Sequence, residues 1–580
     1  MTTHRLFAFG LALAVITTLA QGSAPTPAQL AWLKANAIEV KTVDAGTGFA
    51  DLQQLKAAVG SARIVSLGEA THGTREIFQM KHRLIEFLAS ELGFAIFSIE
   101  ANMPEAYRLN DYVLHGTGDP KALLQGMYFW TWNTEEVLAM IEWMRQFNAT
   151  GKGHIQFTGF DMQTIRVAVD VVGEFLRKVD ADYATAVRTD FADASNLQPA
   201  QSGFGVATGT FPVSAAAGRK ITFSGAIKTR EVDGFAGLWW RADGPKGPLA
   251  FDNMQGRAPN GTSDWKRYEV VLEIPRETVN INFGVLMPGT GTAWFDDLRV
   301  EIDGKPYDAT ELFDFDFESG ATKGFVTPAR GYTARVDDAT ASHGSHSLRI
   351  ESQSGTGVSA KAANAADVSR RLAEVVGHME KARAGYLKQA SAQTVDWATQ
   401  NARIVQQYAQ MVAGEVSRDE SMARNVKWIL DNNPGARLVV WAHNGHVGRI
   451  GQGNFRAMGS YLSDWYGKDY VPVGFAVNRG EYTAIGGGSL GRHPLSPGEP
   501  GSYEYVFARS EIPRFILDLR MARAGDPASG WLRTPMQLRS IGAMAMDSAH
   551  QFAPATLGDV FDLLVFLEQT TATRSVTTPR

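Results

Sequence analysis

The amino-acid sequence predicts an α/β fold, a sheet flanked by helices, with an all-β module inserted into it. Short apolar strands alternate with amphipathic helices over residues 25–194, and the same texture returns over 357–580. Between them, residues 195–356 are rich in glycine, serine, threonine and aromatic residues in short alternating segments. The first pattern is typical of a largely parallel sheet between helices, and the second of a β-sandwich.

The first α/β part opens with a strand and a long helix. Residues 63–67 predict a strand, and the helix expected over about 76–92 ends at Gly93, the residue type that commonly closes helices. Residues 94–99 predict the next strand, with Glu100 at its end. Residues 154–159 predict a third strand, which leads to Asp161. We therefore expect the carboxyl ends of these strands to carry polar residues at one edge of the sheet.

The β module separates the two α/β parts. Its segments 220–223, 237–241, 265–270 and 292–295 alternate in character and are divided by turn residues. Helical texture returns from about Val368 to Asn432, and residues 437–441 form a strand that leads to His443. Such modules are tolerated where a surface loop brings two chain ends close together, so we expect an insertion into a host domain.

Composition and the N-terminal segment restrict the functional classes. The net charge of −5, with acids and bases interspersed, indicates neither nucleic acid nor an anionic membrane as a partner. The absence of cysteine excludes thiol nucleophiles, disulfides and thiolate metal sites. Residues 1–24 have the layout of a secretory signal peptide, with an uncleaved anchor as the alternative. We expect a periplasmic or secreted protein with no membrane span in the mature chain.

Two clusters of polar residues carry the candidate chemistry. Glu69 and His72 follow the first strand, and His443 and His446 follow the strand that ends at Trp441. A carboxylate beside an imidazole fixes its tautomer and raises its basicity, so such a pair can accept a proton from water. With Glu100, these residues predict one catalytic site. Histidine or glutamate at a single strand end is more often structural, and the prediction therefore depends on the whole set.

Two other kinds of catalytic site are less consistent with the sequence. Residues 487–491 match the G-x-S-x-G pattern of serine hydrolases, but Pro494 follows closely where that pattern needs a helix. A zinc site built from His72, His443 and His446 is the second alternative, although no H-E-x-x-H sequence is present. We predict neither a metal nor another cofactor.

Several stretches in series resemble the erythromycin esterase family. They are Gly68–Gly73, Lys81–Leu84, Ile99–Ala101, Gly159–Gln163, Arg418–Asn425 and Ala442–His446. The resemblance implies an α/β fold around one cleft and hydrolysis of a macrolide lactone without a serine nucleophile or a tightly held metal.

The same resemblance implies a role for each cluster. It makes His72 the base that activates water, supported by Glu69 and Glu100, with His443 and His446 lining the cleft. It places Lys81 where the family often has arginine, which leaves the role of Lys81 open. Three groups are alternative candidates to bind the oxyanion: His443, His446 and the backbone amides around Gly445. The residues expected to bind the substrate, a small ester or lactone, are Arg75, Lys81, Asp161, Trp441 and Asn444.

The inserted module resembles the jelly-roll modules classed with carbohydrate-binding domains. The resemblance rests on segments such as Gly237–Arg241, Gly261–Trp265 and Trp294–Asp297. Exposed aromatic side chains there could stack on a glycan, and the alternative is that they fill the core of the sandwich. The alternative function is accordingly a glycan-binding protein whose α/β cleft is inert or transfers an acyl group.

Overall fold

The computed structural model describes residues 24–197, 204–244, 247–254, 257–308, 310–326, 332–352, 358–451, 456–486, 489–546 and 551–576. Residues 1–23 of the predicted signal peptide lie outside the described residues. Gly487 and Gly488 of the G-x-S-x-G sequence also lie outside them. Within the described ranges, no helix is both long enough and apolar enough to cross a membrane.

The chain divides into two compact units. Unit 1 comprises Met1–Glu100, Leu109–Thr158 and Leu430–Arg580, and unit 2 comprises Ala101–Arg108 and Gly159–Ile429. The predicted host domain, residues 25–194 and 357–580, is therefore shared between the two units, and unit 2 holds the β module together with several helices.

Unit 1 is built on a mixed sheet. The described strands run in the order β1 (Ile38–Glu39), β17 (Arg514–Asp518), β20 (Leu563–Thr570), β15 (Tyr470–Gly486), β2 (Ile64–Leu67), β14 (Leu438–Trp441), β3 (Ile96–Asn102) and β4 (Gln156–Asp161), with β16 (Ser489–Leu495) paired to β15. Only the last residues of its strands β3 and β4 belong to unit 2. The pairs from β20 to β3 are parallel, whereas β17 and β1 add antiparallel strands at one edge. The predicted α/β class is confirmed.

The register of three parallel strands positions the two polar clusters. Strand β14 lies between β2 and β3, with Trp441 opposite Leu67 on one side and Ile99 on the other. Because parallel strands in register end at the same edge, the residues that follow each strand emerge together. Segments from the beginning and the end of the chain thus meet at one sheet edge.

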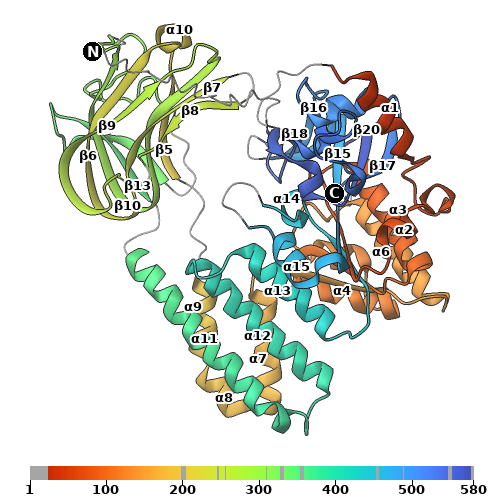
Figure 1. Cartoon of the computed structure of the whole chain (residues 1–580). Coiled ribbons are helices and arrows are strands. Elements are labelled where there is room, and N and C mark those ends of the chain that lie inside the picture. The colour runs from red at the N-terminus through yellow and green to blue at the C-terminus, as the bar shows by residue number, and fades with distance from the viewer. Residues whose placement is uncertain are drawn as a thin grey trace, which may run out of the picture. The chain divides into compact units, whose positions relative to one another are not determined.

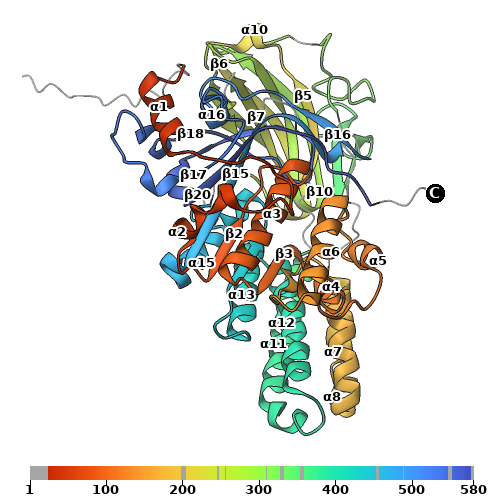
Figure 2. The same ribbon diagram turned by 90° about the vertical axis from the view of Figure 1, so that its right-hand side faces the viewer.

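Helices of unit 1 cover this sheet. Residues of α2 (Leu55–Val59) and α3 (Arg75–Leu92) line an apolar cavity together with β2, β15, β17 and β20, which places both helices against those strands (Figure 2). The remaining helices and the small second sheet of this unit are α1 (Pro27–Asn36), α5 (Pro120–Gln125), α6 (Glu135–Ala149), α14 (Asn444–Val447), α15 (Met458–Tyr466), α16 (Tyr503–Ala508), α17 (Leu557–Val560), β18 (Met536–Arg539) and β19 (Phe552–Ala555). Helix α4 (Met103–His115) begins in unit 2 and ends in unit 1.

Unit 2 contains long helices that lie side by side. Helix α12 (Ala392–Val412) contacts both α11 (Val358–Tyr386) and α7 (Arg166–Val179), as Figure 1 shows. The other helices are α8 (Ala181–Ala186), α9 (Arg188–Asn196), α10 (Val213–Ala216) and α13 (Arg418–Asp431), whose last residues belong to unit 1. Helices α11 to α13 occupy the region that the sequence predicts as helical.

The remaining strands of unit 2 form an antiparallel sheet between residues 204 and 352. They are β5 (Phe204–Thr210), β6 (Lys220–Gly234), β7 (Gly237–Gly244), β8 (Gly247–Asp252), β9 (Gly261–Glu273), β10 (Asn280–Ile302), β11 (Lys305–Pro306), β12 (Tyr332–Asp337) and β13 (Ser347–Ser352). All of them fall inside the predicted range 195–356. That this module is a jelly roll stays a prediction.

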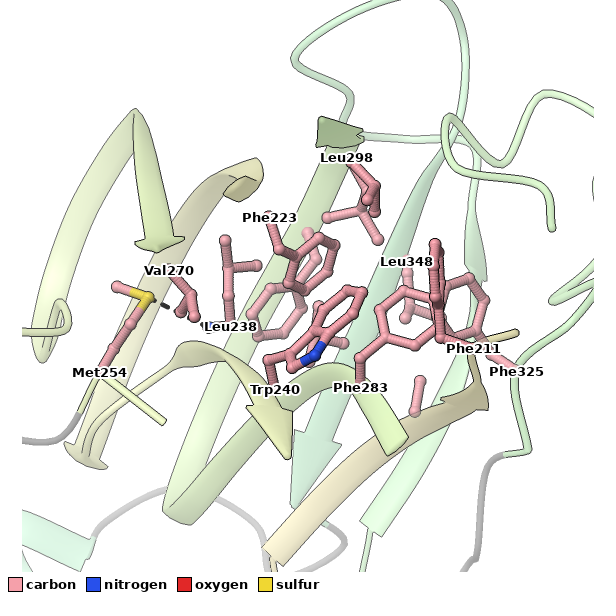
Figure 3. Close-up of a cluster of buried hydrophobic side chains, with 14 of the residues drawn as sticks. Phe211, Phe223, Leu238, Trp240, Met254, Val270, Phe283, Leu298, Phe325 and Leu348 are labelled. Atoms are coloured by element: carbon pink, nitrogen blue, oxygen red, sulfur yellow. Dashed lines mark hydrogen bonds between the residues drawn. The ribbon is translucent and has the colours of Figure 1, made fainter. Parts of the chain in front are cut away.

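Aromatic side chains fill the interior of this module. Trp240 and Phe283 are fully buried with ring centroids 5.0 Å apart, and Phe223 packs against Phe283 at 5.3 Å (Figure 3). Trp294 is also buried and donates to Asp337 over 2.6 Å. Several aromatics that suggested sugar stacking therefore belong to the core, and glycan binding by the module stays a prediction.

Candidate active site

The loop that carries Glu69 and His72 is held by backbone hydrogen bonds from several segments of unit 1. Such bonds fix the loop without using any side chain of the candidate site. The donors and acceptors are Gly68 N to Val473 O at 2.8 Å, Ile541 N to Ala70 O at 2.8 Å, Asn444 N to Glu69 O at 3.0 Å, and Thr483 N and Thr573 N to Gly73 O at 2.9 and 3.0 Å.

Two glycines permit this close packing. A Cβ atom at Gly73 would lie 2.0 Å from the carbonyl oxygen of Thr483, and one at Gly68 would lie 2.2 Å from Oδ1 of Asn444. Both distances are far below van der Waals contact. The glycines that frame the Glu69–His72 segment are therefore required by the backbone and side chain that pass beside them.

Glu69 is fully buried and bonded through both carboxylate oxygens. Its Oε1 lies 2.6 Å from Nδ1 of His72, and its Oε2 accepts from Nζ of Lys81 at 2.6 Å and from Nε1 of Trp441 at 2.7 Å. Burial alone would raise the pKa of Glu69, but Lys81 and His72 outweigh burial and hold this pKa below its ordinary value. Glu69 is thus an ionised carboxylate aimed at the imidazole.

Lys81 is the buried counter-charge in this arrangement. It comes from α3, is fully buried, and its ammonium lies 4.4 Å from the ring centroid of Trp441. Burial lowers the pKa of Lys81 to about 8, although Glu69 opposes this shift. Lys81 therefore carries its charge at neutral pH mainly because Glu69 is beside it.

Glu100 connects β3 to the second cluster. Its Oε2 accepts the backbone N–H of His443 at 3.0 Å, and its Oε1 lies 3.4 Å from Nε2 of His446. The backbone carbonyl of Glu100 accepts from the indole N–H of Trp132 at 2.9 Å. The second cluster is thereby fixed to β3, in which Glu100 lies two residues before the last residue and not, as predicted, at the end of the strand.

His443 is a buried imidazole with both ring nitrogens engaged. Nδ1 accepts the N–H of Gly445 at 3.1 Å, and Nε2 lies 3.2 Å from the carbonyl oxygen of Ile541. These partners require the proton on Nε2. Burial first, and then the neighbouring histidines, lower the pKa of His443 to about 3. His443 is therefore neutral, and its position is fixed by backbone groups.

His72, a member of the first cluster, lies near His443 of the second. Its ring centroid is 5.1 Å from that of His443 and 6.0 Å from that of Trp132. With Nδ1 directed at Glu69, the other nitrogen, Nε2, has no hydrogen bond to any residue that the structure describes. A proton placed on Nδ1 leaves a lone pair on Nε2, which is the arrangement that a general base requires.

The residues predicted to bind substrate are committed to other contacts. Asn444 pairs with the backbone of Phe475, donating to its carbonyl at 2.7 Å and accepting its N–H at 3.1 Å. Arg75 lies 3.2 Å from Glu136 in an ion pair. Substrate contacts by these residues, and by Lys81 and Trp441, stay predictions.

Asp161 lies in the other compact unit. It forms a bidentate ion pair with Arg418, with nitrogen–oxygen distances of 3.1 and 2.6 Å, and also accepts from Gln163. Within unit 2 these contacts join β4 to α13 and involve two of the stretches that carry the family resemblance. A substrate contact by Asp161 also stays a prediction.

Two contributors to the site have no strong sequence signal. Trp132 contacts both His72 and Glu100 from a loop without periodicity, although it ends a notable run of aromatics from Tyr128. Ile541 contributes only its backbone carbonyl, which no residue-type pattern can reveal. Both depend on tertiary structure that brings distant loops together.

A comparison with protein families gives one match. The model of the family described as erythromycin esterase matches residues 89–223 and 316–570, more than half of the chain. The chain belongs to the erythromycin esterase family. The matched ranges include Glu100, His443 and His446 and begin after Glu69 and His72. The match thus covers most of both α/β parts and extends into the first and last strands of the β module.

Curated relatives match over short stretches. The chain is 31% identical over 148 residues to a putative hydrolase, YbfO, from Bacillus subtilis, which is 25% of this chain and 32% of that protein. It is 28% identical over 158 residues to the erythromycin esterase type II of Escherichia coli, covering 26% of this chain and 36% of that protein. The matches thus span about a third of the relatives' length. With the family match, they support a hydrolase.

Solved structures share the fold over nearly the whole chain. A Bacillus cereus protein superposes with a TM-score of 0.59 at 22% identity, covering 95% of this chain and all of that one. A histidine-to-asparagine mutant of the erythromycin esterase EreC, in its open conformation, gives a TM-score of 0.50 at 12% identity, covering 90% of this chain and 94% of that one. At these identities the likeness concerns the fold alone.

Proposed function

We propose that unit 1 hydrolyses a carboxylic ester or lactone, with His72 activating the attacking water. The observation that carries the proposal is the 2.6 Å contact between Nδ1 of His72 and the buried carboxylate of Glu69, which leaves Nε2 for a water molecule. Family membership supports a hydrolase. The macrolide substrate is proposed by analogy with the Escherichia coli relative and its family name.

The reaction follows from the charges at the site. Nε2 of His72 takes a proton as the water oxygen bonds to the ester carbon, and Glu69 stabilises the imidazolium that forms. The proton then passes to the leaving alkoxide as the carbon–oxygen bond breaks, which yields an acid and an alcohol. No serine acyl-enzyme is formed on this route.

We assign the oxyanion to His446. The N–H of Gly445 already donates to His443, and both nitrogens of His443 are engaged, so these two alternatives are less suited to the role. His446 follows His443 in the same loop, and its Nε2 lies 3.4 Å from Oε1 of Glu100. An imidazole N–H can donate to developing negative charge.

The test is mass spectrometry of erythromycin incubated with the full-length protein. Addition of one water by the wild type, and loss of that product in His72→Asn, is the expected result. Parallel reactions with a chelator and with a serine-directed sulfonyl fluoride should proceed unchanged. Unaltered erythromycin together with inert simple esters would reject the proposal, and a product carrying a transferred acyl group would replace hydrolysis by acyl transfer. Recovery in a periplasmic fraction would test the proposed export.

A further inference from the structure

Tyr128, an exposed aromatic residue near the site, has a backbone conformation that is unfavourable for residues other than glycine. Tyr128 lies in the loop between α5 and α6, is 68% exposed, and has φ of 62°, in the left-handed region. Residues other than glycine adopt this region rarely, and asparagine and aspartate do so most readily. A large exposed aromatic in this conformation points to a function for the ring.

The same loop is anchored to the candidate site. Trp132, four residues after Tyr128, is buried, lies against the ring of His72, and donates to the carbonyl of Glu100. A hydrogen bond from Trp132 N to Phe129 O folds the loop back on itself. Because four residues span at most about 14 Å, Tyr128 lies close to the site while staying on the surface.

A second anchored segment presents apolar side chains in the same way. Ile541 holds His443 through its carbonyl and pairs with Thr71 of the His72 loop. Three and five residues later, Met544 and Met546 are 53% and 38% exposed. Methionine is unbranched and polarisable and adapts to irregular apolar ligands. Exposed apolar side chains thus lie within five residues of Trp132, which contacts His72, and of Ile541, which contacts His443.

We infer that Tyr128, Met544 and Met546 bind the apolar body of the ester whose carbonyl His72 attacks. This inference rests on the proposed hydrolysis. The three side chains offer apolar area and only one hydroxyl, which suits the apolar part of such a substrate. These residues set specificity, whereas the chemistry stays with His72 and Glu69.

The test uses p-nitrophenyl esters of increasing acyl length: acetate, butyrate and octanoate. The wild type should gain kcat/KM with length. Tyr128→Asn keeps a residue that tolerates the left-handed region but removes the ring, and Met544→Gln keeps the length of the side chain but makes it polar. Each should raise KM for octanoate about tenfold and leave kcat for acetate unchanged. Tyr128→Phe should behave like the wild type.

Matched controls come from exposed apolar residues elsewhere in unit 1. Met521 is 51% exposed and Trp465 is 41% exposed, and neither lies in the loop from Tyr128 to Trp132 or in the segment from Ile541 to Met546. Met521→Gln and Trp465→Asn should leave the chain-length preference intact, with unfolding temperatures reported for all variants. If Tyr128→Asn and Met544→Gln hydrolyse the acetate ester and keep the chain-length preference of the wild type, this inference is wrong while the proposed function stands. A wild type inert toward every ester would reject both the inference and the proposed function.

Discussion

Glu69 and Lys81 form an ion pair in which neither side chain reaches solvent, with 2.6 Å between Oε2 and Nζ. Removing two charges from water costs free energy, and such pairs are often no more stabilising than apolar residues of similar volume. Here the carboxylate also faces His72, and the ammonium faces the ring of Trp441. The pair therefore positions a negative charge beneath the proposed base.

The lowered pKa of Lys81 predicts a loss of activity at alkaline pH. Burial holds the pKa of Lys81 at about 8, so kcat/KM should fall as the pH rises through about 8, when Glu69 loses its counter-charge. Lys81→Arg, which stays protonated, should move this decline to higher pH. The pH–rate profiles of the two proteins provide the measurement, and a shared alkaline limb would contradict the assignment.

Glu69→Gln should damage both stability and catalysis. The substitution leaves the Lys81 ammonium buried without a carboxylate, a situation that costs about 3–5 kcal/mol of unfolding free energy. In the double variant Glu69→Gln with Lys81→Met, most of that stability should return while activity stays low. Chemical denaturation and ester hydrolysis together distinguish these effects. A double variant as active as the wild type would show that the carboxylate is dispensable.

The sequence predicted that Glu69, His72, Glu100, His443 and His446 would lie together, but it gave no signal for Trp132 and Ile541, which contact them. Glu69, Glu100 and His443 were recognisable because polar residues after apolar runs mark strand ends. The placement of β14 between β2 and β3 was not recognisable, since strand order depends on contacts between segments far apart in the chain. The neutral state of His443 follows from the backbone groups of Gly445 and Ile541, which carry no residue-type signal.

For the fold as well, local features could be predicted from the sequence, whereas features that depend on tertiary contacts could not. Composition located the β module, because short alternating segments are a local property. The sharing of the host domain between two compact units depends on tertiary contacts of helices such as α7 and α12, which no local pattern contains.

Gly73 should tolerate no side chain. In Gly73→Ala the new methyl group would overlap the carbonyl oxygen of Thr483, so the His72 loop must shift. A displacement of about 1 Å can reduce turnover by about 10²-fold. Gly542→Ala is the control, because a Cβ there meets no atom within 4 Å and the residue follows Ile541 directly. Equal kcat values in the two variants would contradict the packing argument.

His82 should make the protein sensitive to acid. It is buried in α3, 3.6 Å from Glu86 and packed on Trp143, and burial lowers its pKa to about 4 from an ordinary 6.5. Between these values the unfolded chain binds a proton that the native chain does not, so stability falls as pH falls. At pH 5 this difference amounts to about 2 kcal/mol.

His82→Phe removes the titrating group and keeps a ring against Trp143. The variant should therefore lose about 2 kcal/mol less unfolding free energy than the wild type when the pH is lowered from 7 to 5, with Glu86 present in both proteins. Urea denaturation followed by tryptophan fluorescence at the two pH values measures the difference. Because His82 lies outside the His72 cluster, ester hydrolysis at pH 7 should be unchanged. Parallel pH dependence in the two proteins would show that His82 is already protonated in the folded state.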